Sequence, residues 1–399
     1  MKKVAIVIPW YGENIPGGAE MECRGIAKNM NKRGINVEIL TTCVKEFNSD
    51  WNKNYYKQGV EKINGITVRR FQVRKRDTRK FDEVNYKLIH NMKITKDEEE
   101  VFFNEMVYSE ELNKFIQDTS GDYKAFLFIP YMFGTTYWGS KICPSKSILI
   151  PCLHDESYAY MKLITKMFEQ NTKGLIFNAK PEMELAKKIY KLNNVKHETI
   201  GLGIEEISKG TPLRFRMKYN IKNPFLLYAG RKDKGKNVDT LINYFSKYKS
   251  KHKDIRLDLV LIGGGTIEDI PENITDNVYD LGFVPIEDKY DAFSASEILC
   301  QPSNNESFSI VIMESWLSRR PVLVSARCDV TKNFAIESNG GLYFDDYYEF
   351  EECVNYMLKN KHIGDKMGTL GYQYVKENFT WDVVISKIVK FINDVMGDE

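Results

Sequence analysis

The sequence has few cysteines and histidines, and none of them falls in a pattern typical of a metal site or a disulfide framework. Its seven cysteines form no CxxC pair, and its five histidines include no HExxH or other paired spacing. A chain of 399 residues does not need disulfides for its stability. We therefore expect reduced thiols, packed mostly as small hydrophobic side chains, in a cytoplasmic protein without a structural metal.

Long hydrophobic runs are also missing, because nothing approaches the ~20 consecutive apolar residues of a membrane span. The apolar run at 4–8 is too short for a signal peptide and fits a first buried strand. No charge of one sign dominates, since 57 Lys and Arg against 55 Asp and Glu give a net charge of +2. This balance argues against a nucleic-acid-binding protein and leaves only local patches to consider.

Two signatures of nucleotide binding are absent as well. The glycine-rich segments do not match GxGxxG, so a nicotinamide enzyme has no direct support. No GxxxxGK(S/T) occurs, which argues against a P-loop NTPase.

Apolar strand-like runs alternate with helical stretches along the chain, which is 43% apolar and 28% charged. At ~150 residues per domain, its length suggests two domains. The pattern predicts an α/β fold, with short buried parallel strands in two doubly wound Rossmann-like domains. The expected strands are 4–8, 37–40, 125–129, 147–150 and 174–177 in the first series, and 225–229, 257–262, 298–300 and 322–324 in the second.

An irregular polar stretch at about 201–222 separates the two series. We predict an N-terminal domain at 1–203 and a C-terminal domain at 204–381. The last helix, about 382–399, is expected to pack back onto the first domain. Residues 81–120 interrupt the alternating pattern, and we expect them to form an insertion with helices of its own.

Ligands of open α/β sheets bind at the carboxyl ends of the strands, so the segments that follow each strand are the candidates. After 225–229 come Arg231 and Lys236, a guanidinium and an ammonium on one turn. Such a pair suits a diphosphate. The alternative is an ordinary basic surface turn.

The segment 304–314 carries the strongest signal. Glu306 precedes a predicted helix, and Ser307, Phe308 and Ser309 can present unpaired N–H groups at its start. Glu314 lies in that helix among apolar residues, where a carboxylate needs hydrogen-bond donors such as ribose hydroxyls. Alternatively, Glu314 pairs with a nearby cation or turns to solvent.

Two weaker candidates lie in the first domain. Gly17 and Gly18 follow the first strand and allow backbone N–H groups to approach a phosphate, although a plain tight turn explains them equally well. His154 follows the run 148–150, and a single histidine is more often structural than catalytic.

Taken together, these segments resemble the retaining glycosyltransferases of family 4, which have the two-domain GT-B fold. The resemblance runs along most of the chain, through five motifs in order. They are Gly17-Gly18-Ala19-Glu20, His154-Asp155-Glu156, Gly230-Arg231 with Lys236 to Ile242, Gly263-Gly264-Gly265 with Leu281 to Val284, and Glu306 with Glu314.

The resemblance implies catalytic roles for four residues. Arg231 and Lys236 would neutralise the diphosphate of the donor as it leaves. Glu306 would contact the donor sugar, and His154 would contact that sugar near its anomeric carbon.

It also implies a set of donor-binding residues. Backbone amides at 308–310 would hold sugar hydroxyls and phosphate, Glu314 would bind the ribose, and the chain at 283–284 would border the base. The complete set is Gly17, Gly18, Gly263, Phe283, Val284, Ser307, Phe308, Ser309, Ile310 and Glu314.

The implied activity is transfer of a sugar, with retention, from a UDP- or GDP-sugar to a hydroxyl of a glycan or lipid-linked acceptor in polysaccharide, glycolipid or glycoprotein assembly. No cofactor or metal is expected, since the two cations would neutralise the diphosphate. The N-terminal domain would be the acceptor side, the C-terminal domain would bind the nucleotide sugar, and the two would face each other across a cleft. Alternatives are a catalytically inactive nucleotide-sugar-binding or scaffold subunit, and a sugar phosphorylase, which would need a longer chain. A glycosidase is disfavoured, because only Glu306 is suitably placed.

Three segments depart from the family pattern. Asn237 replaces a glycine, which a left-handed turn would tolerate. Ser307-Phe308-Ser309 replaces the commoner Gly-Phe-Gly, so the loop loses backbone freedom. Gly201-Leu202-Gly203 stands where the family usually has Asn-Gly.

The segment 69–80 holds seven basic residues and one acidic residue. Two hypotheses are equally open: peripheral contact with anionic lipid at the inner face of the membrane, or a solvated loop.

Overall fold

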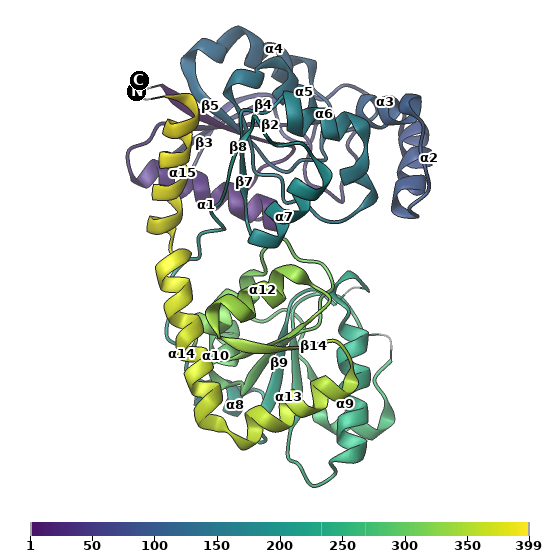
Figure 1. Ribbon diagram of the computed structural model, residues 1–399, viewed down its shortest axis with the longest axis vertical. Coiled ribbons are helices and arrows are strands. Elements are labelled where there is room, and N and C mark those ends of the chain that lie inside the picture. The colour runs from purple at the N-terminus through teal and green to yellow at the C-terminus, as the bar shows by residue number, and fades with distance from the viewer. Residues whose placement is uncertain (1, 233, 268, 398–399) are drawn as a thin grey trace. The chain divides into compact units, whose positions relative to one another are not determined.

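The computed structural model describes residues 2–232, 234–267 and 269–397. Contacts divide the chain into two compact units. Unit 1 comprises Met1–Gly203 and Trp381–Glu399, and unit 2 comprises Ile204–Thr380. Each unit is an α/β structure built on one largely parallel sheet, as the alternating sequence pattern predicted (Figure 1).

The sheet of unit 1 has eight strands in the order β3-β4-β2-β1-β5-β6-β7-β8. Every neighbouring pair is parallel except the β3–β4 hairpin at one edge. The strands are β1 (Lys3–Ile8), β2 (Val37–Thr42), β3 (Gly59–Ile63), β4 (Ile66–Phe71), β5 (Tyr123–Phe128), β6 (Ser147–Leu149), β7 (Gly174–Phe177) and β8 (Lys196–Thr199).

Alternating side chains of β1 pack in two different hydrophobic cores, since successive residues of a strand point to opposite faces of the sheet. Val4 and Ile6 pack with α1 and α15, whereas Ala5 and Val7 pack in the core that includes residues of α2 to α7. The helices of this unit are α1 (Gly18–Lys32), α2 (Thr78–Ile89), α3 (Lys96–Asn104), α4 (Glu110–Thr119), α5 (Gly134–Ile142), α6 (Lys162–Gln170), α7 (Lys180–Ile189) and α15 (Trp381–Met396).

The last helix returns to unit 1 and packs beside α1 (Figure 1). Trp381 at its start occupies the space that side chains at Gly25 and Gly203 would need. A Cβ atom at those glycines would lie 2.0 and 2.2 Å from the Trp381 ring. Two glycines far apart in the sequence therefore make room for one aromatic ring.

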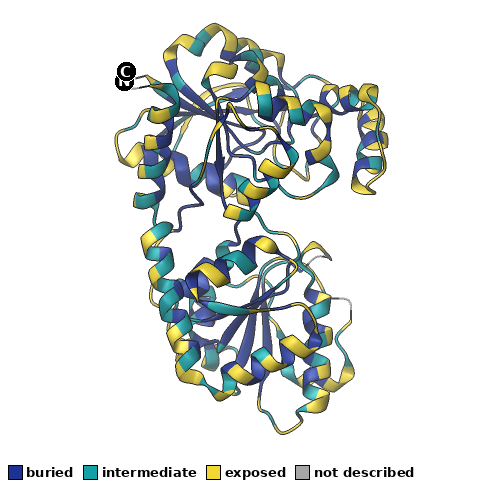
Figure 2. Ribbon diagram, in the orientation of Figure 1, coloured by how far each residue is buried: buried dark blue, intermediate teal, exposed yellow. Residues whose placement is uncertain are grey.

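The sheet of unit 2 has six parallel strands in the order β11-β10-β9-β12-β13-β14. The central strands are buried and the covering helices expose their outer faces (Figure 2). The strands are β9 (Phe225–Ala229), β10 (Asp258–Ile262), β11 (Val278–Asp280), β12 (Ile298–Gln301), β13 (Val322–Ser325) and β14 (Gly341–Phe344).

The helices of unit 2 surround this sheet. They are α8 (Pro212–Lys218), α9 (Val238–Lys251), α10 (Ile286–Ala295), α11 (Ile310–Leu317), α12 (Asp329–Ser338), α13 (Tyr347–Lys359) and α14 (Lys361–Asn378). Helix α8 lies inside the stretch that the sequence suggested was irregular. Its pattern was easily missed because the helix is seven residues long and buries only Phe215.

Most cations of the basic segment 69–80 have partners in the structure. Arg69 pairs with Glu38, and Arg70 pairs with Glu61. Arg74 donates to the Asn104 carbonyl, and Arg76 donates to the Glu105 carbonyl. At exposed positions, Arg79 pairs with Glu83 and Lys80 pairs with Asp77. Contact with anionic lipid stays a prediction, and it rests on fewer exposed cations than the sequence suggested.

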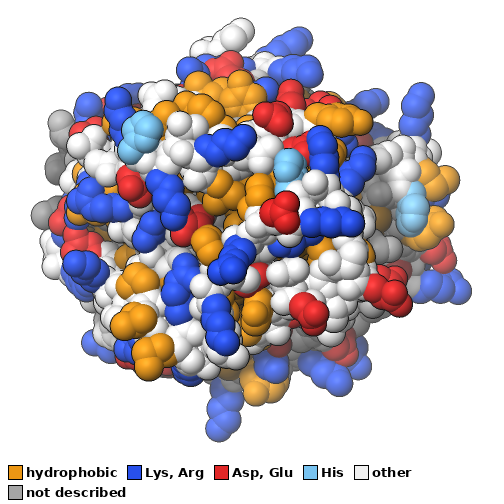
Figure 3. All heavy atoms as spheres, turned by 90° about the horizontal axis from the view of Figure 1, so that it is seen from below, with side chains coloured by type: hydrophobic (Ala, Val, Ile, Leu, Met, Phe, Trp, Pro, Cys, Tyr) orange, Lys and Arg blue, Asp and Glu red, His pale blue; other side chains and the backbone are white. Residues whose placement is uncertain are grey.

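No helix within the described residues is long and apolar enough to cross a membrane. On the face drawn in Figure 3, lysine and arginine side chains are interspersed with acidic ones. This mixture agrees with the near-zero net charge of the chain.

Candidate functional site

The carboxyl ends of three neighbouring strands in unit 2 are joined by backbone hydrogen bonds. The Gly230 amide donates to the Ile262 carbonyl at 3.0 Å, and the Gly263 amide donates to the Gly282 carbonyl at 2.7 Å. A Cβ atom at Gly263 would lie 2.1 Å from the Gly230 carbonyl oxygen, so only glycine allows this approach. The loops after β9, β10 and β11 thus form one surface at the edge where ligands of such sheets bind.

Lys236 and Glu306 meet at this edge, although they lie 70 positions apart in the sequence. The Lys236 Nζ is 2.7 Å from the Glu306 Oε1. Gln301 at the end of β12 donates to the same oxygen at 3.0 Å. The structure therefore brings together two residues that the sequence placed in separate motifs.

Asn237 fixes the loop that carries Lys236. Its backbone is left-handed, with φ 56° and ψ 32°. The family that the sequence resembles usually has glycine at this position. Its side chain donates to the Pro302 carbonyl at 3.1 Å and accepts from the Thr240 hydroxyl at 2.6 Å. An asparagine tolerates this backbone and its amide also ties the β9 loop to the β12 loop.

Arg231 is exposed at the start of the same loop, and its carbonyl accepts a hydrogen bond from the Tyr228 hydroxyl at 2.5 Å. The sequence did not single out Lys232, which is buried instead. Its Nζ donates to the Gly263 carbonyl at 2.6 Å and pairs with Asp280 at 2.8 Å. Lys232 thus holds the glycine loop in place, and only the fold distinguishes it from its basic neighbours.

Ser309, the residue directly before helix α11, has a left-handed backbone with φ 74°. No side chain caps this helix start, and the buried Ser309 hydroxyl has no hydrogen-bond partner among the described residues. Phe308 is buried between Phe334 and Phe379, with ring centroids 5.2 and 5.1 Å away. Its side chain anchors the loop 307–310 and leaves the loop backbone as the part that can contact a ligand.

Glu314 is 6% exposed on α11 and pairs with Lys289 of α10 at 2.6 Å. Burial raises the pKa of this carboxyl, and the Lys289 ammonium opposes the rise. The pairing with a cation is one of the alternatives that the sequence left open. The Glu314 Oε2 has no partner among the described residues, so it can still accept a hydroxyl donor. Sequence reasoning missed Lys289, because nothing in α10 marks it apart from its charge.

Phe283 is 86% exposed beside the glycine loop. A Cβ atom at Gly264 would lie 2.6 Å from its ring, so the missing side chain there lets the ring lie over the loop. Val284 follows it and is half-buried. An exposed aromatic ring over a glycine loop suits stacking with a flat ligand group.

The remaining predicted site residues belong to unit 1. Gly17 precedes α1 with φ 136°, and a Cβ atom there would lie 1.9 Å from the Glu20 Oε2. The other Glu20 oxygen accepts from the Trp10 indole N–H at 2.5 Å. Gly18 is the first residue of α1, and a Cβ atom there would meet no other atom within 4 Å. The glycine at position 17 is thus required by its backbone and by the neighbouring carboxylate.

His154 is half-buried on the loop after β6. Two buried carboxyls lie behind this loop. Glu182 accepts from the Leu153 amide at 2.7 Å, and Glu22 accepts from the Asn178 side chain at 3.0 Å. The Cys152 thiol contacts the same Glu22 oxygen at 3.5 Å. These contacts hold the chain on the N-terminal side of His154.

All seven cysteines are free. Among the described ranges, no group of three or more His, Cys, Asp or Glu side chains is arranged to hold a metal ion.

The chain is similar to known glycosyltransferases. Residues 211–374 match the family Glycosyl transferases group 1. This segment contains the Lys236–Glu306 pair, the glycine loop and Glu314, and it is less than half of the chain. The match and the relatives described next support a glycosyltransferase family.

The chain is 22% identical to an uncharacterized glycosyltransferase of Methanocaldococcus jannaschii, over 99% of this chain and 100% of that protein. It is also 22% identical to a mannosylfructose-phosphate synthase of Agrobacterium fabrum, over 47% of this chain and 44% of the relative. The second match thus spans less than half of that relative's length.

Among solved structures, the chain is similar to the Anabaena protein HepE in complex with UDP-glucose. The TM-score is 0.68 at 14% identity, covering 99% of this chain and 100% of that one. This likeness shows the two-domain GT-B fold.

Proposed function

We propose that the protein is a retaining glycosyltransferase that transfers a sugar from a nucleotide-diphosphate sugar to a hydroxyl group. The acceptor belongs to a polysaccharide, glycolipid or glycoprotein under assembly. The observation that carries the proposal is the Lys236–Glu306 pair, 2.7 Å apart at the carboxyl edge of the unit 2 sheet. The similarity to HepE, which was solved with UDP-glucose, supports the donor class.

In this proposal, Arg231 and Lys236 neutralise the diphosphate. Lys236 is already held by Glu306, so its ammonium needs little reorganisation when the anion binds. A guanidinium and an ammonium stabilise the negative charge that develops as the sugar–phosphate bond breaks. We propose that the reaction needs no added metal, because these two cations supply that stabilisation.

The remaining residues of the unit 2 site bind the rest of the donor. Glu306 and the amides at 308–310 contact the sugar, and the unpartnered Glu314 Oε2 accepts from the ribose. Phe283 borders the base. The acceptor oxygen attacks the anomeric carbon on the face from which the diphosphate leaves, and its proton passes to the departing phosphate oxygen. One C–O bond breaks, one C–O bond forms, and the configuration is retained.

A thermal-shift panel of UDP- and GDP-sugars tests the donor class. A ligand at 100 times its dissociation constant stabilises the folded chain by about 2.7 kcal/mol. We expect one family of nucleotide sugars to raise the melting temperature and Lys236→Ala to abolish most of that rise. Lys251→Ala is the matched control, because Lys251 pairs with Glu351 at 2.8 Å in the same unit but outside the site.

Turnover distinguishes an enzyme from an inactive subunit. We expect sugar transfer or slow donor hydrolysis that persists in EDTA and falls at least 100-fold in Lys236→Ala. Donor binding without any turnover would favour the inactive nucleotide-sugar-binding subunit. Equal turnover in wild type and Lys236→Ala would show that the site is wrongly assigned.

A further inference from the structure

Unit 1 contains a pocket between α3, α5 and α6 that the proposed function does not use. These three helices contact one another at one side of the sheet (Figure 1). The pocket has a volume of about 280 Å³, and all three helices contribute to its lining. Drug-sized ligands commonly occupy about 300–1,000 Å³, so this pocket suits a smaller molecule.

The last turn of α5, which carries the pocket residue Lys141, lies near the amino ends of the strands. The carbonyl of Cys143, directly after α5, accepts from the Ser147 hydroxyl at 2.8 Å. Ser147 is the first residue of β6. Substrates of open α/β sheets bind at the carboxyl ends of the strands instead. The pocket is therefore separate from the loops that follow the strands.

Contacts between the helices hold the walls of the pocket in place. The Tyr137 ring of α5 stacks on the Phe103 ring of α3, with centroids 4.1 Å apart. The Trp138 indole N–H donates to the Phe103 carbonyl at 3.2 Å. Glu99 of α3 accepts from two amides at the start of α6, at 3.0 and 2.9 Å. A pocket held in this way needs little reorganisation to bind a ligand.

Positive charge exceeds negative charge among the lining residues. Three lysines, Lys96, Lys141 and Lys166, face a single acid, Glu100. Glu100 lies 3.5 Å from Lys96. Within the described part of the chain, Lys141 and Lys166 form no ion pair, and the Lys141 Nζ lies 5.2 Å from the centre of the Trp138 ring. Two ammonium groups are thus available for an anion.

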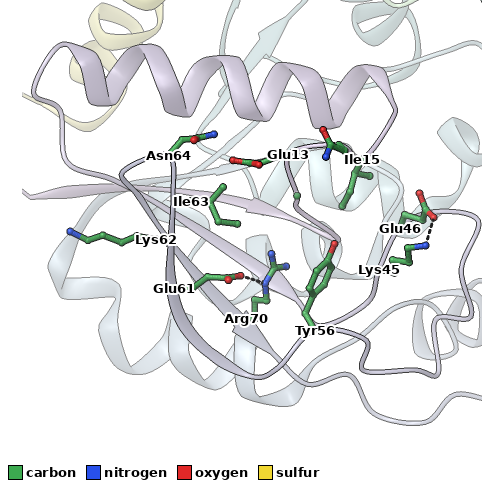
Figure 4. Close-up of a pocket in the computed structure, with 12 residues that line it drawn as sticks. Glu13, Ile15, Lys45, Glu46, Tyr56, Glu61, Lys62, Ile63, Asn64 and Arg70 are labelled. Atoms are coloured by element: carbon green, nitrogen blue, oxygen red, sulfur yellow. Dashed lines mark hydrogen bonds and ion pairs between the residues drawn. The ribbon is translucent and has the colours of Figure 1, made fainter. Parts of the chain in front are cut away.

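A second pocket of unit 1, shown in Figure 4, has the opposite charge arrangement. Three basic and three acidic residues line it, so it has no net charge. Two of its cations are already paired, Arg70 with Glu61 and Lys45 with Glu46 at 3.4 Å. Of these two pockets, the one between α3, α5 and α6 is therefore the better site for an anion.

The pocket between α3, α5 and α6 also presents polar groups that the protein leaves without partners. Tyr137 is only 6% exposed, and its hydroxyl has no hydrogen-bond partner among the described residues. The same holds for the side-chain amides of Asn104 and Asn171, which also line the pocket. Hydroxyl and amide groups both donate and accept, so they suit the hydroxyl groups of a ligand. Trp138 and Leu163 add apolar surface for a ring.

We propose that this pocket binds a small sugar phosphate. The ammonium groups of Lys141 and Lys166 bind the phosphate as point charges. Tyr137, Asn104 and Asn171 bind the sugar hydroxyls. The inference goes beyond the proposed function and does not depend on it, because no residue of the donor site takes part and the bound sugar is not the one that reacts.

Isothermal titration calorimetry on the full chain at low salt tests the proposal. The probes are glucose 6-phosphate, fructose 6-phosphate and mannose 6-phosphate, with glucose and inorganic phosphate as comparators. We expect at least one sugar phosphate to bind at least tenfold more tightly than either comparator, because its ring and its phosphate both contribute. Absence of binding by all three, or equal affinity for inorganic phosphate, would overturn the proposal.

Three variants locate the binding site. Lys141→Gln and Lys166→Gln each remove one ammonium group from an exposed position. Tyr137→Phe removes the unpartnered hydroxyl and keeps the ring that stacks on Phe103. We expect about tenfold loss of affinity in each lysine variant and about fivefold loss in Tyr137→Phe. Circular dichroism and the melting temperature verify that the variants fold.

The matched control is Lys188→Gln, which removes an exposed lysine of α7 that does not line the pocket. It should bind the sugar phosphate as wild type does. Unchanged affinity in both Lys141→Gln and Lys166→Gln would overturn the inference. Loss of affinity in Lys236→Ala alone would place the sugar phosphate at the donor site and would also overturn it.

The nucleotide-sugar panel separates this inference from the proposed function. Donor-induced stabilisation without sugar-phosphate binding would refute the pocket alone. Sugar-phosphate binding that Lys166→Gln weakens, without any donor binding, would refute the glycosyltransferase and leave the pocket between α3, α5 and α6 as a binding site.

Discussion

Glu314 shows how one buried charge depends on its partner. Its carboxylate is 6% exposed and only one of its oxygens meets Lys289, at 2.6 Å. Desolvation of a carboxylate is costly unless a cation or several donors compensate for it. The Lys289 ammonium therefore stabilises the charged form, while the second oxygen remains available for a ligand.

This arrangement predicts the effect of removing the cation. Lys289→Met should lower the free energy of unfolding at pH 7 by about 3 kcal/mol, because it leaves a buried carboxylate unpaired. Glu314→Gln should restore most of that loss when combined with Lys289→Met. Urea unfolding of the two single variants and the double variant provides the measurement. If Lys289→Met unfolds as wild type does, the pair contributes little to stability.

At the scale of elements, the residue before α11 has a strained backbone and also belongs to the proposed donor site. Ser309 has φ 74°, a conformation that costs a side-chain-bearing residue about 1–2 kcal/mol. The family that the sequence resembles commonly has glycine here, so the sequence alone indicated that this loop would lose backbone freedom. The structure adds that the serine adopts the left-handed backbone nevertheless.

Substitution by glycine should relieve this strain. We expect Ser309→Gly to leave the free energy of unfolding unchanged or to raise it by about 0.5 kcal/mol, since relief of strain outweighs the added freedom of the unfolded chain. The matched control is Ser315→Gly, in the interior of the same helix, which should cost about 1 kcal/mol. Chemical unfolding of both variants measures the two changes in the free energy of unfolding. A clear loss of stability in Ser309→Gly would contradict the strain argument.

At the same scale, the expected strands matched β1, β2, β5 to β7, β9, β10, β12 and β13, because buried parallel strands are short apolar runs bounded by turns. The β3–β4 hairpin was missed. Its strand β3 is largely exposed and carries charged residues such as Glu61, so no apolar run marks it. Arg70 was therefore grouped with a basic surface segment, whereas it is buried.

On the scale of the whole molecule, several elements of unit 1 share a cluster of buried acids. Glu22 of α1 meets Asn178 after β7 and Cys152 after β6, and Glu182 of α7 binds the amides of Leu153 and Asn178. Burial raises the pKa of Glu22 to about 7 and that of Glu182 to about 8.

These shifts predict that alkaline pH destabilises the chain. Since the folded state holds protons that the unfolded state releases near pH 4.5, each carboxyl supports stability fully below about pH 4.5, and this support is lost as the pH rises through about 7 to 8. Glu22→Gln keeps a neutral side chain that can still accept from Asn178.

We therefore expect the fall in unfolding free energy between pH 5 and pH 8.5 to be smaller in Glu22→Gln than in wild type, by about 1.4 kcal/mol for each unit of pKa shift removed. Urea unfolding at several pH values measures this difference. Glu83→Gln, at an exposed position, should retain the wild-type slope. Parallel slopes in wild type and Glu22→Gln would show that Glu22 titrates normally.

The sequence by itself determined the two α/β units and the loops that follow their strands, because the apolar period of buried strands and the glycines of tight turns are local properties of the chain. It also indicated Arg231, Lys236, Glu306 and Glu314 as candidates. Only the tertiary structure decided which charges meet. Lys236 pairs with Glu306, Lys289 with Glu314, and Arg70 with Glu61. Such pairings depend on strand order and helix packing, which bring distant residues within hydrogen-bond distance and which no local pattern encodes.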